Sequence, residues 1–256
     1  MMIAPFLSLL LAQAAPATTL DQDRLTVCQA EARRDPATAI ASASTWLGEA
    51  GADSRSYPHQ CLGVAYVSLL RWQAAEDAFA AARAARGEND RGGRARLGAM
   101  AGNAALADGR YQAAREHFDQ AQADAAAAGD PILSGEIAGD RAKALVGLDL
   151  QEEASRALAD ARRDAPQRVE TWLLSATLSR RLGNLDQAQG EIQTAASLAA
   201  SDPAVGLEAG VIAALAGRDD AARRSWRSVL ELAPDAPEAA TARDYLAQLD
   251  AGDAAE

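Results

Sequence analysis

The sequence predicts an all-α fold, a right-handed solenoid of helical hairpins that ends in a C-terminal capping helix. Its main support is a ladder of five alanines spaced 39, 40, 34 and 34 residues apart. A large apolar residue follows each alanine at plus four, and alanine or valine follows at plus seven, steps typical of one helix face. The ladder alanines are Ala75, Ala114, Ala154, Ala188 and Ala222, and the large residues are Phe79, Phe118, Leu158, Ile192 and Trp226. The composition agrees, because a chain that is 49% apolar but only 4% aromatic favours alanine-rich helices with thin interfaces.

Residues 202–234 are the clearest copy of the predicted hairpin. The first segment carries Gly206, Ala209, Gly210 and Ala213, the turn carries Gly217, and Pro234 closes the second segment. The turn position, five residues before each ladder alanine, also holds Gly109 and Gly183, whereas Leu70 and Asp149 replace glycine in the other two copies. We therefore expect two helices per copy that cross closely at small residues, with one large residue filling each gap.

This pattern resembles the tetratricopeptide repeat, a 34-residue helix–turn–helix unit. The copies that contain Phe79 and Phe118 carry more of its signature, which includes Leu62, Gly63 and Tyr66 in one and Gly102 and Tyr111 in the other. The resemblance covers residues 56–234, which we interpret as five repeats with a polar, glycine-rich insert at 87–93 and a loop or a lengthened helix end at 125–131. It implies a solenoid that binds other proteins and leaves the identity of the partner open.

The regions that flank these repeats are interpreted as atypical ends, which solenoids usually have because a terminal repeat lacks one neighbour. Residues 15–55 are expected to form a degenerate N-terminal repeat, with helices over 20–34 and 36–48. Asp35 is its expected N-cap and Pro36 lies in the first turn, while Ala39, Ala43 and Trp46 imitate the second-helix pattern. Residues 235–249 are expected to form a capping helix, and residues 250–256 a disordered acidic tail.

Residues 1–14 have the outline of a secretory signal peptide. An apolar run ends in Ala12-Gln13-Ala14, a small-residue cleavage site, although no Lys or Arg precedes the run. We therefore expect cleavage after Ala14 and a periplasmic protein without direct membrane insertion; the alternative is an apolar N-terminus on a cytosolic protein. A lipoprotein site at Cys28 is disfavoured, because valine precedes it and charged residues replace the apolar run.

The only two cysteines are Cys28 and Cys61. In the expected register both lie on first helices of adjacent repeats, which pack side by side. An oxidising periplasm would favour one disulfide between them. The alternative is a pair of buried thiols that fill small positions in the core.

The composition favours neither an enzyme nor a nucleic-acid-binding protein. Lys and Arg number 25 against 36 Asp and Glu, a net charge of −11, which disfavours nucleic acid and anionic membranes. His59 and His117 are the only histidines, and no cysteine–histidine cluster has metal-ligand spacing. The acidic pairs at 152–153 and 219–220 suit helix starts. We therefore expect no catalysis, no cofactor and no metal.

The resemblance places function on the concave face, which the first helices line. Carried over by register, the lining includes Tyr57, Gln60, Val64, Arg96, Asn103, Lys143, Thr177, Arg180, Arg181 and Val211. Four of these are basic and predict a positive strip suited to an acidic peptide or a chain terminus; alternatively, these bases only solvate the groove. The family's carboxylate clamp is matched by Asn103 alone, because Ala99, Glu136 and Asp140 stand where the clamp has Lys, Lys and Arg.

These observations predict a non-catalytic protein–protein interaction scaffold in the bacterial envelope, which docks a partner's segment in the groove. The alternative is a fixed structural subunit of an envelope assembly that contacts its partners through the convex face or the ends. The expected partner is a protein or peptide, and the sequence leaves the oligomeric state open.

Overall fold

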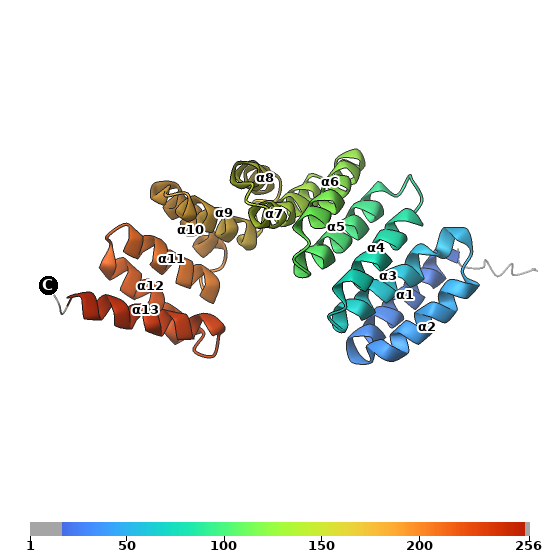
Figure 1. Ribbon diagram of the computed structural model, residues 1–256, viewed down its shortest axis with the longest axis horizontal. Helices are drawn as coiled ribbons and strands as arrows, with labels where there is room; N and C mark the ends of the chain where they lie inside the picture. Colours follow the sequence, from blue (N-terminus) through green and yellow to red (C-terminus); the bar gives the residue numbers. More distant parts are fainter. Residues whose placement is uncertain (1–16, 254–256) are drawn as a thin grey trace, which may run out of the picture. The chain divides into compact units, whose positions relative to one another are not determined.

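The computed structural model describes residues 17–253, which form thirteen α-helices and one short 3-10 helix without any strand. The predicted signal peptide, residues 1–14, lies outside the described residues. The chain divides into two compact units, with the boundary between Glu88 and Asn89, inside the insert expected at 87–93. Within the described range, no helix is both long and apolar enough to cross a bilayer. The prediction of an all-α helical-repeat fold is confirmed (Figure 1).

Unit 1 contains the degenerate N-terminal repeat and the first regular hairpin. Its helices are α1 (Ala17–Arg34), α2 (Pro36–Glu49), α3 (Ser56–Ser68) and α4 (Trp72–Ala84), with the 3-10 turn η1 (Ala52–Ser54) before α3. Helix α3 packs against α1, α2 and α4. Asp35 caps α2, as expected, because its carboxylate accepts the backbone N–H of Thr38 at 3.1 Å. Ala39, Ala43 and Trp46 of α2 are buried, so this atypical repeat uses the same apolar face as the others.

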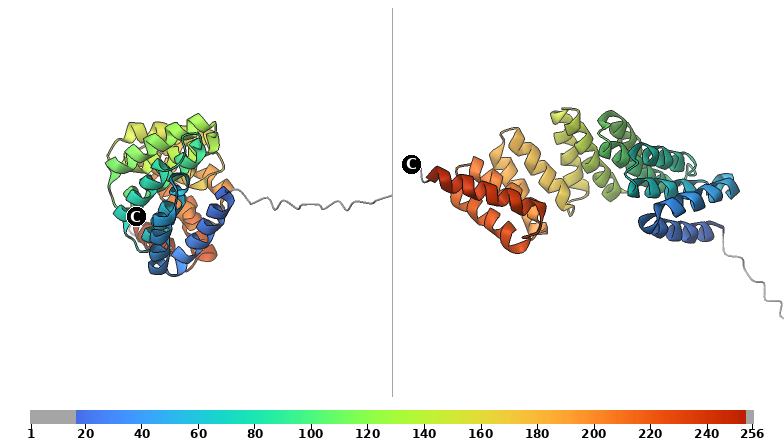
Figure 2. Two further views of the ribbon diagram at one scale, coloured as in Figure 1. Left: turned by 90° about the vertical axis from the view of Figure 1, so that its right-hand side faces the viewer. Right: turned by 60° about the horizontal axis from the view of Figure 1, so that its bottom comes forward.

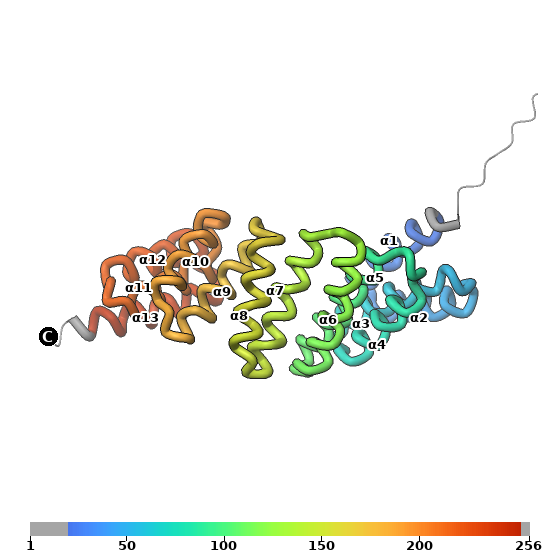
Figure 3. The backbone as a smooth tube through the Cα atoms, turned by 90° about the horizontal axis from the view of Figure 1, so that it is seen from above, coloured from blue at the N-terminus to red at the C-terminus, as the bar shows by residue number. Residues whose placement is uncertain are grey.

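Unit 2 contains four hairpins and a final helix, which follow one another in chain order (Figures 2 and 3). The first helices of the hairpins are α5 (Arg91–Ala107), α7 (Pro131–Gly147), α9 (Val169–Arg181) and α11 (Pro203–Leu215). The second helices are α6 (Tyr111–Ala128), α8 (Gln151–Asp164), α10 (Leu185–Leu198) and α12 (Asp219–Leu232), and α13 (Pro237–Asp253) closes the unit. First helices contact one another where α5 meets α7 and α9 meets α11, and α13 covers α11 and α12.

The predicted ladder is confirmed in both units. Each ladder alanine is fully buried, and the large apolar residue that follows it is buried as well, from Phe79 to Trp226. Glycines on the first helices make this packing possible, because a methyl group at Gly102 would lie 2.7 Å from the Phe118 ring. Gly63 and Gly210 face Phe79 and Trp226 in the same way. The sequence motif of a small residue opposite a large one is therefore a helix-crossing contact.

The turn inside each of these hairpins uses one residue with a left-handed backbone. Gly109, Gly183 and Gly217 have φ of +71°, +79° and +67°, which glycine adopts without a steric cost. Leu70 and Asp149, which replace glycine, adopt the same conformation with φ of +55° and +60°. The turn geometry is thus kept in all five copies even where the sequence does not favour it.

Two boundaries expected from the sequence are wrong. Helix α13 continues to Asp253, so residues 250–253 of the expected disordered tail are helical. Asp250 contributes to this, because its carboxylate accepts the Arg223 guanidinium at 3.0 Å. The insert at 87–93 is also shorter than expected, since α5 begins at Arg91 and Asp90 caps it by accepting the Gly93 N–H at 2.9 Å.

Candidate functional site

Unit 1 contains three of the residues expected to line a groove, Tyr57, Gln60 and Val64, and all three lie on α3. Tyr57 is buried, with the Arg86 guanidinium 4.9 Å from its ring centroid. Gln60 is half-buried. Tyr57 therefore packs within unit 1, and its ring offers little surface to a partner.

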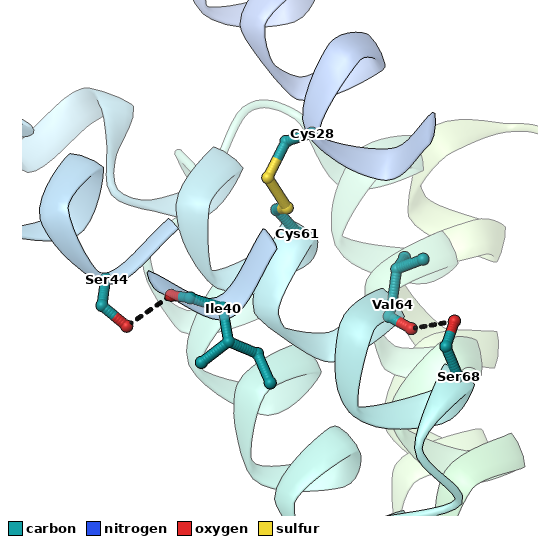
Figure 4. The surroundings of a disulfide bond; sticks show 6 residues. All are labelled: Cys28, Ile40, Ser44, Cys61, Val64 and Ser68. Atoms are coloured by element: carbon teal, nitrogen blue, oxygen red, sulfur yellow. Dashed lines mark hydrogen bonds between the residues drawn. A yellow bond between two sulfur atoms is a disulfide. The ribbon is translucent and has the colours of Figure 1, made fainter. Parts of the chain in front are cut away.

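The two cysteines of unit 1 form a disulfide that joins α1 to α3 (Figure 4). Their Cα atoms are 6.0 Å apart, within the usual range for a bridge. Both residues are buried in a small apolar cluster together with Ala43, Leu62 and Ala78. The structure thus contains the pairing preferred from the sequence, and the bridge fastens the atypical first helix to the first regular repeat.

In unit 2, Asn103 and Lys143 meet at one carboxylate, that of Asp140. The Asn103 amide donates to Asp140 at 3.2 Å, and the Lys143 ammonium donates to it at 3.1 Å. Lys143 also pairs with Glu170 on α9. Arg168, in the connection before α9, donates to both Asp140 and Glu170 at 3.1 Å. These five residues, hereafter the central cluster, connect α5, α7 and α9.

Contacts within the central cluster shift the pKa values of two of its members, Glu170 and Lys143. Burial alone would raise the pKa of the Glu170 carboxyl, but the hydrogen bond and charge of Lys143, with the charge of Arg168, hold it below its ordinary value. Burial alone would lower the pKa of Lys143, but its hydrogen bond to Glu170 and the charge of Asp140 raise it above its ordinary value. Both groups are therefore held in their charged forms at neutral pH.

The other expected groove cations of unit 2 differ in their surroundings. Arg180 on α9 makes a two-pronged contact with Glu208 on α11, at 2.6 and 3.3 Å. Arg96 on α5 lies 3.4 Å from Asp130, the N-cap of α7, yet its side chain remains 62% exposed. Arg181 is exposed and has no ion-pair partner among the described residues. Thr177 is half-buried and donates to the Leu173 carbonyl at 3.0 Å.

The positive strip expected from the sequence is therefore corrected by the structure. Of its four cations, Arg96, Lys143 and Arg180 each face a carboxylate supplied by the following repeat, and Arg181 alone stays unpaired in the described part of unit 2. The physical reason is that neighbouring first helices bring side chains about one repeat apart into contact. The result is a set of ion pairs that join neighbouring repeats.

Sequence reasoning missed Arg168, Glu170 and Glu208 as members of this surface. The sequence did contain a signal for these ion pairs, because the two oppositely charged residues of each pair are separated by about one repeat. Lys143 and Glu170 are 27 residues apart, Arg180 and Glu208 are 28 apart, and Arg96 and Asp130 are 34 apart. Among the described residues, no group of three or more His, Cys, Asp or Glu side chains is placed to hold a metal ion.

The stacked hairpins, the small-against-large crossings and the left-handed turns define a helical-repeat solenoid of the tetratricopeptide type. The sequence matches no protein-family model and no curated protein. Solved structures share the fold: PilW, a type IV pilus biogenesis factor, superposes with a TM-score of 0.69 at 17% identity over 89% of this chain and 99% of its own. PilF of Pseudomonas aeruginosa gives 0.69 at 15% identity over 90% and 98%. YrrB, a TPR protein with an unusual peptide-binding site, gives 0.55 at 17% identity over 79% and 97%.

Proposed function

We propose that this protein is a non-catalytic interaction scaffold that docks a segment of a partner protein along the first helices of unit 2. The carrying observation is the surface that begins at Arg96 and Asn103 and continues through the central cluster to Arg180 and Arg181. Its polar side chains, on successive first helices, hydrogen-bond to one another, and Arg96 and Arg181 remain exposed beside them. Such a row can pair with the backbone and polar side chains of an extended segment. The peptide-binding site named for YrrB supports the same use of this fold.

The charge of the proposed segment follows from which groups stay open. Lys143 and Arg180 already have carboxylate partners, so a partner's carboxylate would have to displace a resident one. Arg181 and the largely exposed Arg96 can accept a carboxylate at less cost. We therefore propose that acidic groups of the segment, or its chain terminus, contact these two arginines, with an attraction that weakens as salt increases.

We also propose that the protein acts in the bacterial envelope after cleavage of residues 1–14. The Cys28–Cys61 disulfide supports an oxidising compartment, because cytosolic thiols are kept reduced. The likeness to PilW, a pilus biogenesis factor, is compatible with an envelope role. Sequencing the N-terminus of the protein recovered from periplasm would test this; a start at Met1 or Met2 would contradict the cleavage.

The docking proposal is tested by crosslinking and then by charge reversal. A photo-crosslinking amino acid at Thr177, which is half-buried on α9, should capture a defined partner in cells, and the same group at Ser155 on α8 serves as the control. With the purified partner, Arg96→Glu/Arg181→Glu should weaken binding by about tenfold, because two exposed attractive pairs of roughly 0.7 kcal/mol each are lost. Arg96 also pairs with Asp130, but its side chain is 62% exposed, so water screens the reversed charge. Reversing Arg180 and Lys143 instead would set like charges against Glu208, which is largely buried, and against Glu170, and would disturb the fold.

The matched control is Arg156→Glu/Arg227→Glu, which changes the net charge equally on exposed positions of the second helices α8 and α12. It should leave the dissociation constant unchanged. If both double variants weaken binding equally, the effect is one of net charge and the docking surface lies elsewhere.

The alternative function, a fixed subunit that binds through an end, has one observation in its favour. Helices α1 and α2 line a groove of about 230 Å³ that includes Arg24, Val27 and Trp46. Val27 is exposed in this groove, and Leu20, seven residues earlier on α1, is exposed as well. Crosslinking from Val27 but not from Thr177 would favour this alternative.

A further inference from the structure

A second feature of unit 2 is a cavity of about 300 Å³ beside the central cluster. The start of α7 and the connection between α8 and α9 form it. Ile132, Ala165 and Pro166 supply its apolar wall, and Glu136, Asp164 and Arg168 stand around it. Arg168 belongs to both this cavity and the central cluster, so the cavity adjoins the proposed docking surface.

The cavity exists because the stack is loosest at this point. Among consecutive helices of unit 2, α8 and α9 make the sparsest contact, and the connection between them occupies part of the space. That connection is held in place on both sides. The Trp172 indole donates to the Pro166 carbonyl at 2.8 Å, and Gly135 of α7 is packed so tightly that a methyl group would lie 2.8 Å from the Ala165 nitrogen. The wall of the cavity is therefore preformed.

Ile132 gives the cavity its apolar character. It is the second residue of α7 and remains 61% exposed. Glu136 and Asp140 follow it at steps of four along the same helix, so all three share one face of α7. An exposed isoleucine beside a preformed apolar wall can bury a large apolar side chain, which stabilises a complex by about 25 cal/mol for each Å² removed from water.

The charges around the cavity are not balanced. The charge of Arg168 is already paired, since its guanidinium donates to the carboxylates of Asp140 and Glu170 and to the Glu136 carbonyl, the last at 2.7 Å. Asp164 accepts two hydrogen bonds from Arg163, at 2.8 and 2.9 Å. The Glu136 carboxylate is exposed and has no ion-pair partner in the described part of the chain. The open charge at this rim is therefore negative.

We propose that this cavity is an anchor pocket for a large apolar side chain of the docked partner segment, with a Lys or Arg beside that side chain paired to Glu136. The inference rests on the proposed docking function and adds its specificity. An anion or acidic ligand is disfavoured because the charge of Arg168 is already shared by the carboxylates of Asp140 and Glu170, and because Glu136 would repel it. A second copy is disfavoured because the chain carries a net charge of −11.

The test uses defined peptides on the full mature chain. Four short Gly/Ser peptides carry Leu-Lys, Leu-Glu, Ser-Lys or Ser-Glu at their centre, and binding is followed by the δ1-methyl NMR signals of isoleucines. Leu-Lys should shift the Ile132 signal and leave that of the buried Ile212 unchanged. Leu-Glu should bind about fivefold more weakly, near the upper limit for one exposed charge pair. Ser-Lys and Ser-Glu should give no shift.

Variants separate the two parts of the site. Glu136→Lys should reverse the preference so that Leu-Glu binds better than Leu-Lys. Glu152→Lys, an equal charge change on an exposed position of α8, should preserve the original preference. Ile132→Ser removes the reporting methyl group, so peptide binding to this variant is followed by the backbone amide signals of Ala165 and Gln167, which also line the cavity. Leu-Lys should shift these signals in the native chain and leave them unchanged in Ile132→Ser. The fold should be unaltered because Ile132 is exposed, and the methyl spectrum of the other isoleucines reports on this.

Several outcomes would overturn the anchor pocket. They are an unshifted Ile132 signal, an equal response to Leu-Lys and Leu-Glu in both the native chain and Glu136→Lys, or a dimer that dissociates on Ile132→Ser. Its failure is distinct from failure of the docking function. If Arg96→Glu/Arg181→Glu weakens partner binding while Ile132→Ser and Glu136→Lys do not, docking holds and the pocket is not its anchor.

Discussion

At the scale of single residues, Leu70 is the least expected feature of the turns. It takes a left-handed backbone with φ of +55° and its side chain is 68% exposed. For residues other than glycine this conformation costs about 1–2 kcal/mol, and an exposed side chain recovers little by packing. Asp149 occupies the equivalent turn, but short polar residues tolerate the conformation better. The strain at Leu70 is therefore the larger of the two.

Leu70→Gly should stabilise unit 1 by about 0.5–1 kcal/mol, the relief of the left-handed backbone less the greater freedom of glycine in the unfolded chain. Guanidinium unfolding with a probe in unit 1 would measure it. Gly183→Ala, at a turn with φ of +79°, is the opposite control and should destabilise unit 2 by about 1 kcal/mol. A loss of stability in Leu70→Gly would show that the leucine makes a useful contact.

At the scale of helices, the hairpins depend on glycines that let a large side chain cross them. Phe118 of α6 is fully buried and its ring lies against Gly102 of α5. The two residues depend on each other. The Phe118 ring fits only because Gly102 has no Cβ atom, and without the ring the space beside Gly102 would be an empty cavity. This interdependence explains why the sequence pairs small and large residues at fixed spacing.

Phe118→Ala should destabilise unit 2 by about 3–5 kcal/mol, the usual loss for a large buried side chain. Gly102→Ala should cost about 1–3 kcal/mol through overpacking, and combining Gly102→Ala with Phe118→Leu should cost less than the two single changes added together. Gly190→Ala is the control, because nothing lies within 4 Å of the added methyl and a helix gains from alanine. A loss below about 1 kcal/mol for Phe118→Ala would contradict the assigned packing.

The central cluster links α7 to α9 through charge, so its contribution should depend on pH. The folded pKa of Glu170 is depressed, so its stabilisation is present above the unfolded value, near 4.5, and is lost as pH falls through the folded pKa. The folded pKa of Lys143 is raised, so its stabilisation is present below 10.5 and is lost as pH rises through the folded pKa.

Lys143→Met should therefore reduce the fall in Tm of unit 2 between neutral pH and about pH 3, because Glu170 loses its main partner. Thermal unfolding followed by circular dichroism at several pH values would show this. Arg156→Met, which removes an exposed cation from α8, should keep the acid sensitivity of the native chain. Equal acid profiles for the native chain and Lys143→Met would exclude a role for this cluster in acid stability.

At the scale of the whole molecule, the chain is divided into two units, and the disulfide belongs entirely to the first. It closes a span of 33 residues between Cys28 and Cys61. In the chain-entropy model such a closure stabilises by roughly 3–4 kcal/mol. The bridge therefore strengthens the smaller unit, which has only two helical hairpins with which to build a core.

Replacing both cysteines by alanine should lower the stability of unit 1 by roughly 3–4 kcal/mol and leave unit 2 unchanged. Hydrogen exchange read by mass spectrometry separates the units, since amides of α1 and α3 should lose protection while those of α7 and α11 keep it. Unreduced tryptic peptides from the native protein should contain the Cys28–Cys61 pair. Free thiols in material from the envelope would contradict the bridge.

The sequence by itself determined the repeat and its register. Alanine at one fixed position, a large apolar residue four positions later and a turn residue five positions earlier are local requirements of a helical hairpin, so they are visible in the order of residues. The ladder, the N-cap at Asp35 and the Cys28–Cys61 pair follow from such local rules or from the spacing of adjacent repeats. The length of α13 did not follow, because Asp250 is stabilised by Arg223, a residue of another helix.

Only the tertiary structure decided which charged side chains of unit 2 pair with one another and which stay unpaired. In the sequence Arg96, Lys143 and Arg180 are three bases on helix faces that a groove would share. In the folded chain each meets a carboxylate about one repeat further on, and Glu136 is left with an open charge beside an apolar cavity. The physical reason is that pairing between side chains depends on the distance between stacked helices, which no single repeat contains.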